Sequence, residues 1–387
     1  MDDHREQRGA DGEGAGPRSI VSPRPGEAEH VGGVARESPE SALGAAGGVE
    51  GAPRPPDEGR RRGRRRWAGA GISYAVTIFA LVTLNFLLPR AMPGDPIDAL
   101  LAQGSSGFVF GEEARAELEE YYGLDRSLAA QYGQYLTGLA RGDLGRSIVT
   151  NTPVWDELAR RLPWTLLLIV SAALVSTVVG LVAGVHSGWR RDRPMDRALM
   201  TMLLALREFP PYLLGSLLLY VFAVKLGWLP LFGAETPFSG AFSPVERVVD
   251  VGRHLLLPLL VLSVGLTAGN YLIMRAGMVG ELGSDYLLLG RAKGLRERRL
   301  KYRYVARNAL LPLVSLTAIQ LGFALTAVVL IERVFSYPGL GRLLFEAIAV
   351  RDYPIIQGAF LLISVGVVTI NAVADALYRR LDPRTAP

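Results

Sequence analysis

Cysteine is absent from the 387 residues, and the four histidines are scattered at positions 4, 30, 186 and 254. The absence of cysteine excludes disulfide bonds, cysteine zinc sites and thiol chemistry. The sequence also contains no GxxxxGK(S/T) phosphate-binding loop, no HExxH zinc motif and no DxDxDG calcium loop. We therefore expect no catalytic residue, no metal site and no cofactor-binding site in this chain.

Residues 1–66 lack phenylalanine, tyrosine, tryptophan and lysine and are rich in Gly, Pro, Ala, Arg and Glu. Such a segment buries too little apolar surface to offset the entropy lost on ordering, so we expect a disordered cytoplasmic tail. It ends in RRRGRRR, from Arg60 to Arg66, directly before an apolar segment. That position favours a cytoplasmic stop for a membrane span over a nucleic-acid site.

The remaining chain is strongly apolar, and its long apolar runs argue against two or three soluble domains. Each run is close to the length that crosses a hydrocarbon core of about 30 Å. Backbone groups inside a bilayer must satisfy one another, so these runs predict helices and an all-α polytopic membrane protein with six transmembrane helices over residues 67–380. The six runs are residues 67–88, 162–189, 198–224, 255–274, 308–331 and 353–374.

The positions of the arginines predict the orientation of the chain. Loops 190–197, 275–307 and 379–387 carry the basic clusters, whereas the short loop 333–352 carries only three arginines. Basic loops remain in the cytoplasm, so both termini are expected inside and segment 91–161 outside.

Within the third run, Arg207 and Glu208 interrupt the apolar sequence, and Pro210 and Pro211 should bend the helix. Intramembrane charges are candidates for a transport path, so Glu208, Pro210 and Pro211 are translocation-path candidates. The charges are expected near the cytoplasmic end of their span, and the prolines fit a hinge or a packing kink equally well.

Glycines recur at every fourth position in the second run, at Gly180, Gly184 and Gly188. This spacing favours close helix packing over a gate. The runs lack a chain of carboxylates, which disfavours a transporter driven by protons.

The inward loop at residues 281–307 is too long for a plain connection. Ser284 or Asp285 can cap a short helix that Gly294 ends, and a second helical run follows with basic residues. A positive-inside anchor explains the charge alone. A docking surface for a cytosolic protein also explains the length and the internal glycine.

This loop resembles the EAA loop of ABC importer permeases of the dipeptide, oligopeptide and nickel family. The family's alanine-rich ARAKG motif corresponds to GRAKG here, from Gly290 to Gly294, and RNALLP follows from Arg307 to Pro312. MPGDPIDALL, LGWLPLFG and ERVFSYPGLGRLLFEAIAVRDYPIIQG are similar to further family segments. The resemblance implies an ATPase-coupling loop formed by Asp285, Gly290, Arg291, Ala292, Lys293, Gly294, Leu295, Asn308 and Pro312.

The resemblance further implies a type I-like bundle in the bacterial cytoplasmic membrane. It implies four partner subunits: a second homologous permease, two cytosolic ATP-binding subunits that hydrolyse ATP, and an extracytoplasmic solute-binding protein. It implies no nucleic-acid partner. The chain itself would not be an enzyme. Peptides are the first expected solute, followed by nickel chelates or other small solutes.

The sequence departs from the family where Gly290 replaces an alanine and where Leu288 and Leu289 replace more polar residues. Two other functions stay open. One is a polytopic scaffold or sensor that docks a cytosolic partner without transport. The other is a membrane enzyme, although the sequence contains no catalytic motif that supports it.

Overall fold

A computed structural model describes residues 57–97 and 112–381. These residues form helices and no strand, apart from one isolated antiparallel bridge between Arg146 and Pro153. The described residues from Arg64 onward form one compact unit. The long helices are α1 (Asp57–Ala91), α5 (Val154–Trp189), α8 (Pro244–Glu281), α11 (Ala306–Val334) and α13 (Tyr353–Leu381).

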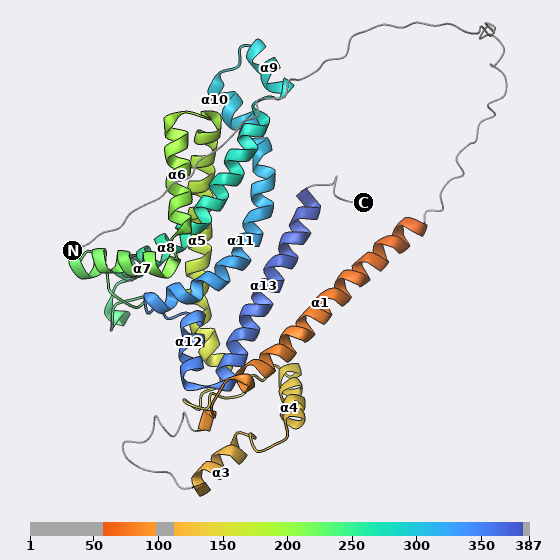
Figure 1. The fold of residues 1–387 in the computed structure, drawn as a ribbon, viewed down its shortest axis with the longest axis vertical. Helices are drawn as coiled ribbons and strands as arrows, with labels where there is room; N and C mark the ends of the chain where they lie inside the picture. The colour runs from red at the N-terminus through yellow and green to blue at the C-terminus, as the bar shows by residue number, and fades with distance from the viewer. Residues whose placement is uncertain (1–56, 98–111, 382–387) are drawn as a thin grey trace, which may run out of the picture. The chain divides into compact units, whose positions relative to one another are not determined.

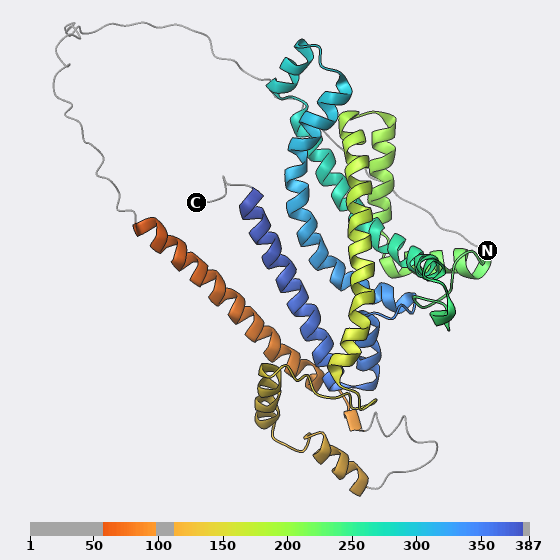
Figure 2. The same cartoon turned by 180° about the vertical axis from the view of Figure 1, so that it is seen from behind.

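Shorter helices connect the long ones. α11 begins next to α9 and α10 and ends next to α12, so these short elements lie at opposite ends of the bundle, as Figures 1 and 2 show. The short elements are α3 (Glu112–Tyr121), α4 (Leu128–Ala140), α6 (Pro194–Glu208), α7 (Pro211–Leu219), the π-helix η1 (Tyr220–Lys225), the 3₁₀-helix η2 (Ser239–Ala241), α9 (Asp285–Ala292), α10 (Glu297–Arg299), the π-helix η3 (Leu300–Val305) and α12 (Leu340–Val350).

The all-helical membrane fold predicted from the sequence is confirmed, but the number of spans is not. Four helices in the described ranges are long and apolar enough to cross a membrane, namely Ser73–Ala91 in α1, α5, α8 and Tyr353–Val373 in α13. A fifth candidate is α6 with α7 and η1, a pair bent by 97°. α11 contains the fifth expected run within a helix of 29 residues, so six spans remain a prediction.

The start of α1 differs from expectation. The helix begins at Asp57, ten residues before Trp67, so residues 57–66 are helical although the composition predicts disorder. Arginine is a good helix former, and an arginine run that directly precedes a long helix extends it. The rest of the expected tail lies outside the described residues.

α5 and α8 form the most extensive helix pair in the bundle. A Cβ atom built at Gly180, Gly184 or Gly188 would lie 2.6–2.7 Å from the Cβ of Asn270, Met274 or Met278, respectively. Only glycine permits this backbone approach, because real Cβ atoms do not come so close. The packing interpretation of the glycine spacing therefore agrees with the structure.

α11 packs against α8, α5 and α13, and the largest apolar cluster lies among these helices. Its most buried members include Leu168 on α5, Val261 on α8 and Ile331 on α11. Because α11 packs in this way, the segment directly before it, η3, is connected to the interior of the bundle.

Candidate functional site

α9 starts where the sequence predicts a cap. Ser284 is the N-cap residue, and Asp285 occupies the first turn, where its negative charge is favourable next to the free backbone N–H groups. The Ser284 hydroxyl donates to the backbone oxygen of Glu281 (2.7 Å) and so caps no N–H of α9. The segment therefore turns directly out of α8 into α9.

Gly294 ends α9 in a Schellman motif. The N–H of Gly294 donates to the oxygen of Arg291 (2.9 Å), and the N–H of Leu295 donates to the oxygen of Gly290 (3.1 Å). Gly294 has φ +71°, in the left-handed region that favours glycine. A Cβ at this position would meet no atom within 4 Å, so only the backbone conformation demands glycine. The predicted role of Gly294 as a helix terminator agrees with this geometry.

Gly290 has a different reason to be glycine. A Cβ built there would lie 2.6 Å from Cδ2 of Leu300 and 3.6 Å from Cδ1 of Leu295. The side chain of Leu300 is fully buried and fills the place that a methyl group at position 290 would take. α9 and η3 are held together by this contact.

The buried side of the loop continues into the bundle. Leu287 on α9 and Leu300 and Val305 on η3 pack in one apolar cluster with Met278 of α8 and Val185 of α5. A displacement of α9 would therefore press on two membrane-spanning helices, because close-packed interiors transmit strain.

The outer side of the loop is apolar and basic. Leu288 is 70% exposed and Leu289 55% exposed, next to the exposed Lys293. An exposed ion pair joins Nε of Arg291 to Oε1 of Glu297 (3.2 Å) across Gly294. Two leucines exposed on a protruding helix indicate a surface that a partner covers.

η3 connects the loop to the end of α5. The Tyr302 hydroxyl is hydrogen-bonded to Nε2 of His186 (3.3 Å). Lys301 is buried and has no carboxylate partner among the described residues. Its burial, followed by the nearby positive charge of Arg190, lowers the pKa of the Lys301 ammonium. This end of the bundle therefore carries positive charge that the described residues do not neutralise.

An ion-pair network beneath the loop joins three helices. Arg275 of α8 binds Asp196 of α6 through Nε (2.7 Å) and Nη2 (2.6 Å), and Ser187 of α5 donates a hydrogen bond to the same carboxylate. Tyr271 of α8 is hydrogen-bonded to the Ser187 hydroxyl (2.6 Å). This network was not predicted from the sequence. The basic segment RRDRPMDR contains two acids, Asp192 and Asp196, and nothing in it marks Asp196 as the one that Arg275 binds.

The remaining coupling-loop candidates lie at the start of α11 or in α9. Asn308 and Ala292 are exposed, and the side chain of Pro312 lies outside the described residues. The predicted set from Asp285 to Leu295 is thus brought together in one knob, with Asn308 just beyond it.

The path candidates are not in this knob. Phe209 ends α6 in extended backbone, Pro210 precedes α7, and the chain bends by 97° between the two helices. Glu208 lies twelve residues from Asp196 along α6, or roughly 18 Å at 1.5 Å per residue. Glu208 therefore lies at the end of α6 that is distant from Asp196, whereas its expected place near the cytoplasmic end of a span stays a prediction.

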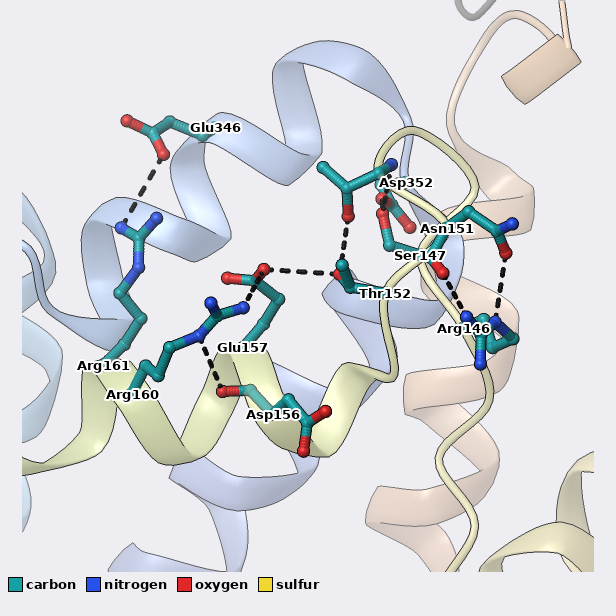
Figure 3. A network of polar contacts seen from close by, with 11 residues as sticks. Arg146, Ser147, Asn151, Thr152, Asp156, Glu157, Arg160, Arg161, Glu346 and Asp352 are labelled. Atoms are coloured by element: carbon teal, nitrogen blue, oxygen red, sulfur yellow. Dashed lines mark hydrogen bonds and ion pairs between the residues drawn. The ribbon is translucent and has the colours of Figure 1, made fainter.

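At the opposite end of the bundle, a polar clasp joins segment 146–153 to the turn between α12 and α13 (Figure 3). Asp352 is buried and accepts hydrogen bonds from the hydroxyl of Ser147 and from the backbone N–H groups of Ile148 (3.2 Å) and Ile355 (3.4 Å). A cavity of about 280 Å³ lies beside it, with Glu157, Arg161 and Glu346 in its lining.

A second buried carboxylate ties α11 to α12 near the clasp. Glu332 is fully buried and accepts hydrogen bonds from the Thr165 hydroxyl (2.6 Å) and from the N–H of Gly341 (2.7 Å). The Thr165 hydroxyl in turn accepts from the N–H of Leu340 (2.8 Å). These contacts fix the end of α11 that is distant from the coupling knob. Neither acid was predicted from the sequence, because the partners of each lie on other segments of the chain.

Comparison with known proteins gives one consistent family. Residues 176–387 match the family described as the binding-protein-dependent transport system inner membrane component. The chain is 36% identical over 311 residues to the glutathione transport system permease protein GsiC of Escherichia coli K12, covering 79% of this chain and 94% of that protein. The same protein of Shigella boydii serotype 4 is equally similar.

Among solved structures, the chain is similar to the MetNI methionine ABC transporter in inward-facing conformations. The TM-score is 0.47 at 18% sequence identity, covering 58% of this chain and 96% of that chain. On the family match and the full-length relatives, the chain belongs to the binding-protein-dependent transport system inner membrane components and is a permease subunit of an ABC importer.

Proposed function

We propose that the chain forms half of a transmembrane path for small peptides, with both termini in the cytoplasm. The relatives at 36% identity are named for the transport of glutathione, which is itself a small peptide. Nickel chelates and other small solutes are the alternatives. The partners in this proposal are a second homologous permease, two cytosolic ATP-binding subunits and an extracytoplasmic solute-binding protein.

The observation that carries the proposal is the construction of the coupling knob. Its outer face exposes Leu288 and Leu289, while its inner face seats Leu287 and Leu300 in the bundle. A groove on an ATP-binding subunit could cover the outer face, and movement of that subunit would reach α5, α8 and α11 through the inner face. Rigid-body switching of this kind is a common mode of conformational coupling.

The Schellman motif at Gly294 provides a sharp test. Gly294→Val places a β-branched residue at φ +71°, which it adopts only with strain, and should redirect α10 relative to α9. Gly294→Asn is the matched control, because asparagine tolerates the left-handed region and a Cβ meets no atom there.

Both variants should be reconstituted with the ATP-binding subunits and the solute-binding protein. We expect Gly294→Val to insert and to bind the loaded solute-binding protein, yet to lose most of the stimulation of ATP hydrolysis and most of the uptake. Gly294→Asn should retain both. If Gly294→Val keeps full stimulation of ATP hydrolysis and full uptake, the coupling role is wrong. Such a result would favour the interpretation as a scaffold without transport.

A further inference from the structure

A cavity of about 310 Å³ lies where α5 ends and α6 begins, and the function described so far does not use it. Basic side chains dominate its polar lining, together with apolar side chains from the start of α6. The lining residues are His186, Ser187, Arg190, Arg193, Pro194, Met195, Asp196 and Leu199.

The cavity carries uncompensated positive charge. Arg190 and Arg193 are exposed and form no ion pair within the described ranges. The one carboxylate in the lining, Asp196, is already bound by both Nε and Nη2 of Arg275. The buried Lys301 adds a further cation close to Arg190.

Apolar side chains continue from the cavity along the bundle surface. Met195 lies in the lining, Met202 is two turns further along α6, and Val182 is one turn before His186 on α5. All three are exposed. In a chain that spans a bilayer, exposed apolar side chains on spanning helices contact acyl chains or a second membrane subunit.

We propose that this cavity binds the phosphate of an anionic phospholipid, with Arg190 and Arg193 as its ligands and the acyl chains along Val182 and Met202. Basic pockets at the cytoplasmic ends of membrane helices suit such head groups. Guanidinium groups suit them in particular, because each can donate two parallel hydrogen bonds to a phosphate. The continuous apolar surface favours a lipid over a free anion or an acidic protein segment.

The lipid would also act on the coupling knob. His186 lines the cavity and is hydrogen-bonded to Tyr302 of η3, which connects α9 and α10 to α11. A bound phosphate would neutralise the charge beside Lys301 and hold η3 against the end of α5. This regulatory step rests on the proposed function, and the binding step does not.

Binding is tested on the full chain, purified in detergent and titrated with phosphatidylglycerol or phosphatidylcholine, with bound lipid counted by native mass spectrometry. The test variant is Arg190→Gln/Arg193→Gln. The control is Arg191→Gln/Arg197→Gln, which removes the same charge from the same segment at exposed residues outside the cavity lining. Neither arginine of the test variant has a carboxylate partner among the described residues, so the fold should survive, as size-exclusion chromatography will check.

Each arginine near a lipid surface contributes about fivefold in affinity. Both double variants lose two arginines and therefore the same long-range attraction to anionic lipid. A specific phosphate site would show as a further loss of affinity in the test variant alone. We expect the test variant to lose phosphatidylglycerol affinity at least about tenfold more than the control, with phosphatidylcholine unchanged in both. Equal losses in the two double variants would overturn the proposal.

Two further arms separate the alternative occupants. Millimolar inorganic phosphate should not displace phosphatidylglycerol, and displacement would assign the cavity to a free anion. If the test variant keeps its lipid but no longer retains the ATP-binding subunits, the arginines bind a protein and the lipid assignment is wrong.

The regulatory step is measured separately in the reconstituted transporter. Vesicles of phosphatidylcholine with 20 mol% phosphatidylglycerol, as a working composition, are compared with pure phosphatidylcholine vesicles. We expect phosphatidylglycerol to raise stimulated ATP hydrolysis for the wild type and the control, and not for the test variant. A similar response in all three chains would leave the lipid site in place and overturn its regulatory role.

Discussion

Gly294, Gly290 and Gly184 show three separate physical reasons for the same residue type. Gly294 occupies a left-handed backbone conformation in open space. Gly290 leaves room for the terminal methyl of Leu300, and Gly184 lets the backbone of α5 approach that of α8. Substitutions should therefore differ in their effects. Only the third kind meets neighbouring backbone atoms, which cannot move aside cheaply.

We predict that Gly184→Ala destabilises the α5–α8 pair. The new Cβ would lie 2.7 Å from the Cβ of Met274 and 2.9 Å from the backbone oxygen of Tyr271, so the helices must separate. Overpacking of this kind costs about 1–3 kcal/mol. The measurement is the melting temperature of the purified chain in detergent. Gly265→Ala on α8 is the control. Its Cβ meets nothing within 4 Å and alanine is the better helix former, so this variant should melt at or above the wild-type temperature.

We predict that Asp352→Asn loosens the polar clasp. An amide offers one acceptor oxygen where the carboxylate uses two, so at least one buried donor loses its partner. An unsatisfied buried donor costs about 1–3 kcal/mol. Limited trypsin digestion should then cleave faster after Arg146, in the segment that the clasp holds. Asp143→Asn is the control, because it removes an exposed carboxylate. If the rate of cleavage after Arg146 rose equally in this control, Asp352 would not be the residue that holds the segment.

At the scale of single elements, the sequence predicted what depends on local pattern. Apolar runs gave α5, α8 and α13, and the combination of a cap at Ser284 with a break at Gly294 gave α9 and its end. Pro210 and Pro211 indicated a bend, because proline removes a backbone donor and clashes with the preceding turn. These features depend on neighbours within a few residues.

Contacts between distant segments could not be predicted in this way. Arg275 is 79 residues from Asp196, and Asp352 is 205 residues from Ser147. Nothing in the local pattern distinguishes these acids from solvated ones. The size of the bend after Glu208 likewise depends on how α7 packs against α8 and α11.

The broken helix yields a prediction at its own scale. Because the break exposes Glu208 at a bend within a candidate span, we expect this position to contact water in the path. The chain lacks cysteine, so Glu208→Cys supplies a unique thiol. It should react with a charged, membrane-impermeant maleimide, and the rate should change when ATP is bound.

Leu217→Cys on α7 is the control for this experiment, since Leu217 is apolar and exposed on the bundle surface. It should react with a lipid-soluble maleimide and hardly at all with the charged one. Equal protection of both cysteines from the charged reagent would place Glu208 outside the path.

At the scale of the whole molecule, the two ends of the bundle differ in what they present. The α9 end carries exposed leucines and unneutralised cations, whereas the α12 end carries buried carboxylates held by backbone N–H groups. The first arrangement suits a surface that binds a partner and anionic lipid. The second suits a rigid connection between helices. The α9 end therefore presents a surface open to a partner, and the α12 end joins its helices through buried contacts.

This polarity predicts the orientation in the membrane. Basic loops stay in the cytoplasm, so the α9 end should be inside and segment 112–153 outside. Single cysteines at Arg191 and Leu288, in cells that lack the ATP-binding subunits, should resist a membrane-impermeant maleimide while the cells are intact and react after permeabilisation, because both side chains are exposed. Leu300 is unsuitable for labelling, since it is fully buried. Asp143→Cys is exposed at the opposite end and should react in intact cells. External labelling at Arg191 or Leu288, or protection at Asp143 that permeabilisation relieves, would show that the orientation is reversed. A reversed chain could not present α9 to a cytosolic ATP-binding subunit, so this labelling also tests the coupling proposal without requiring transport.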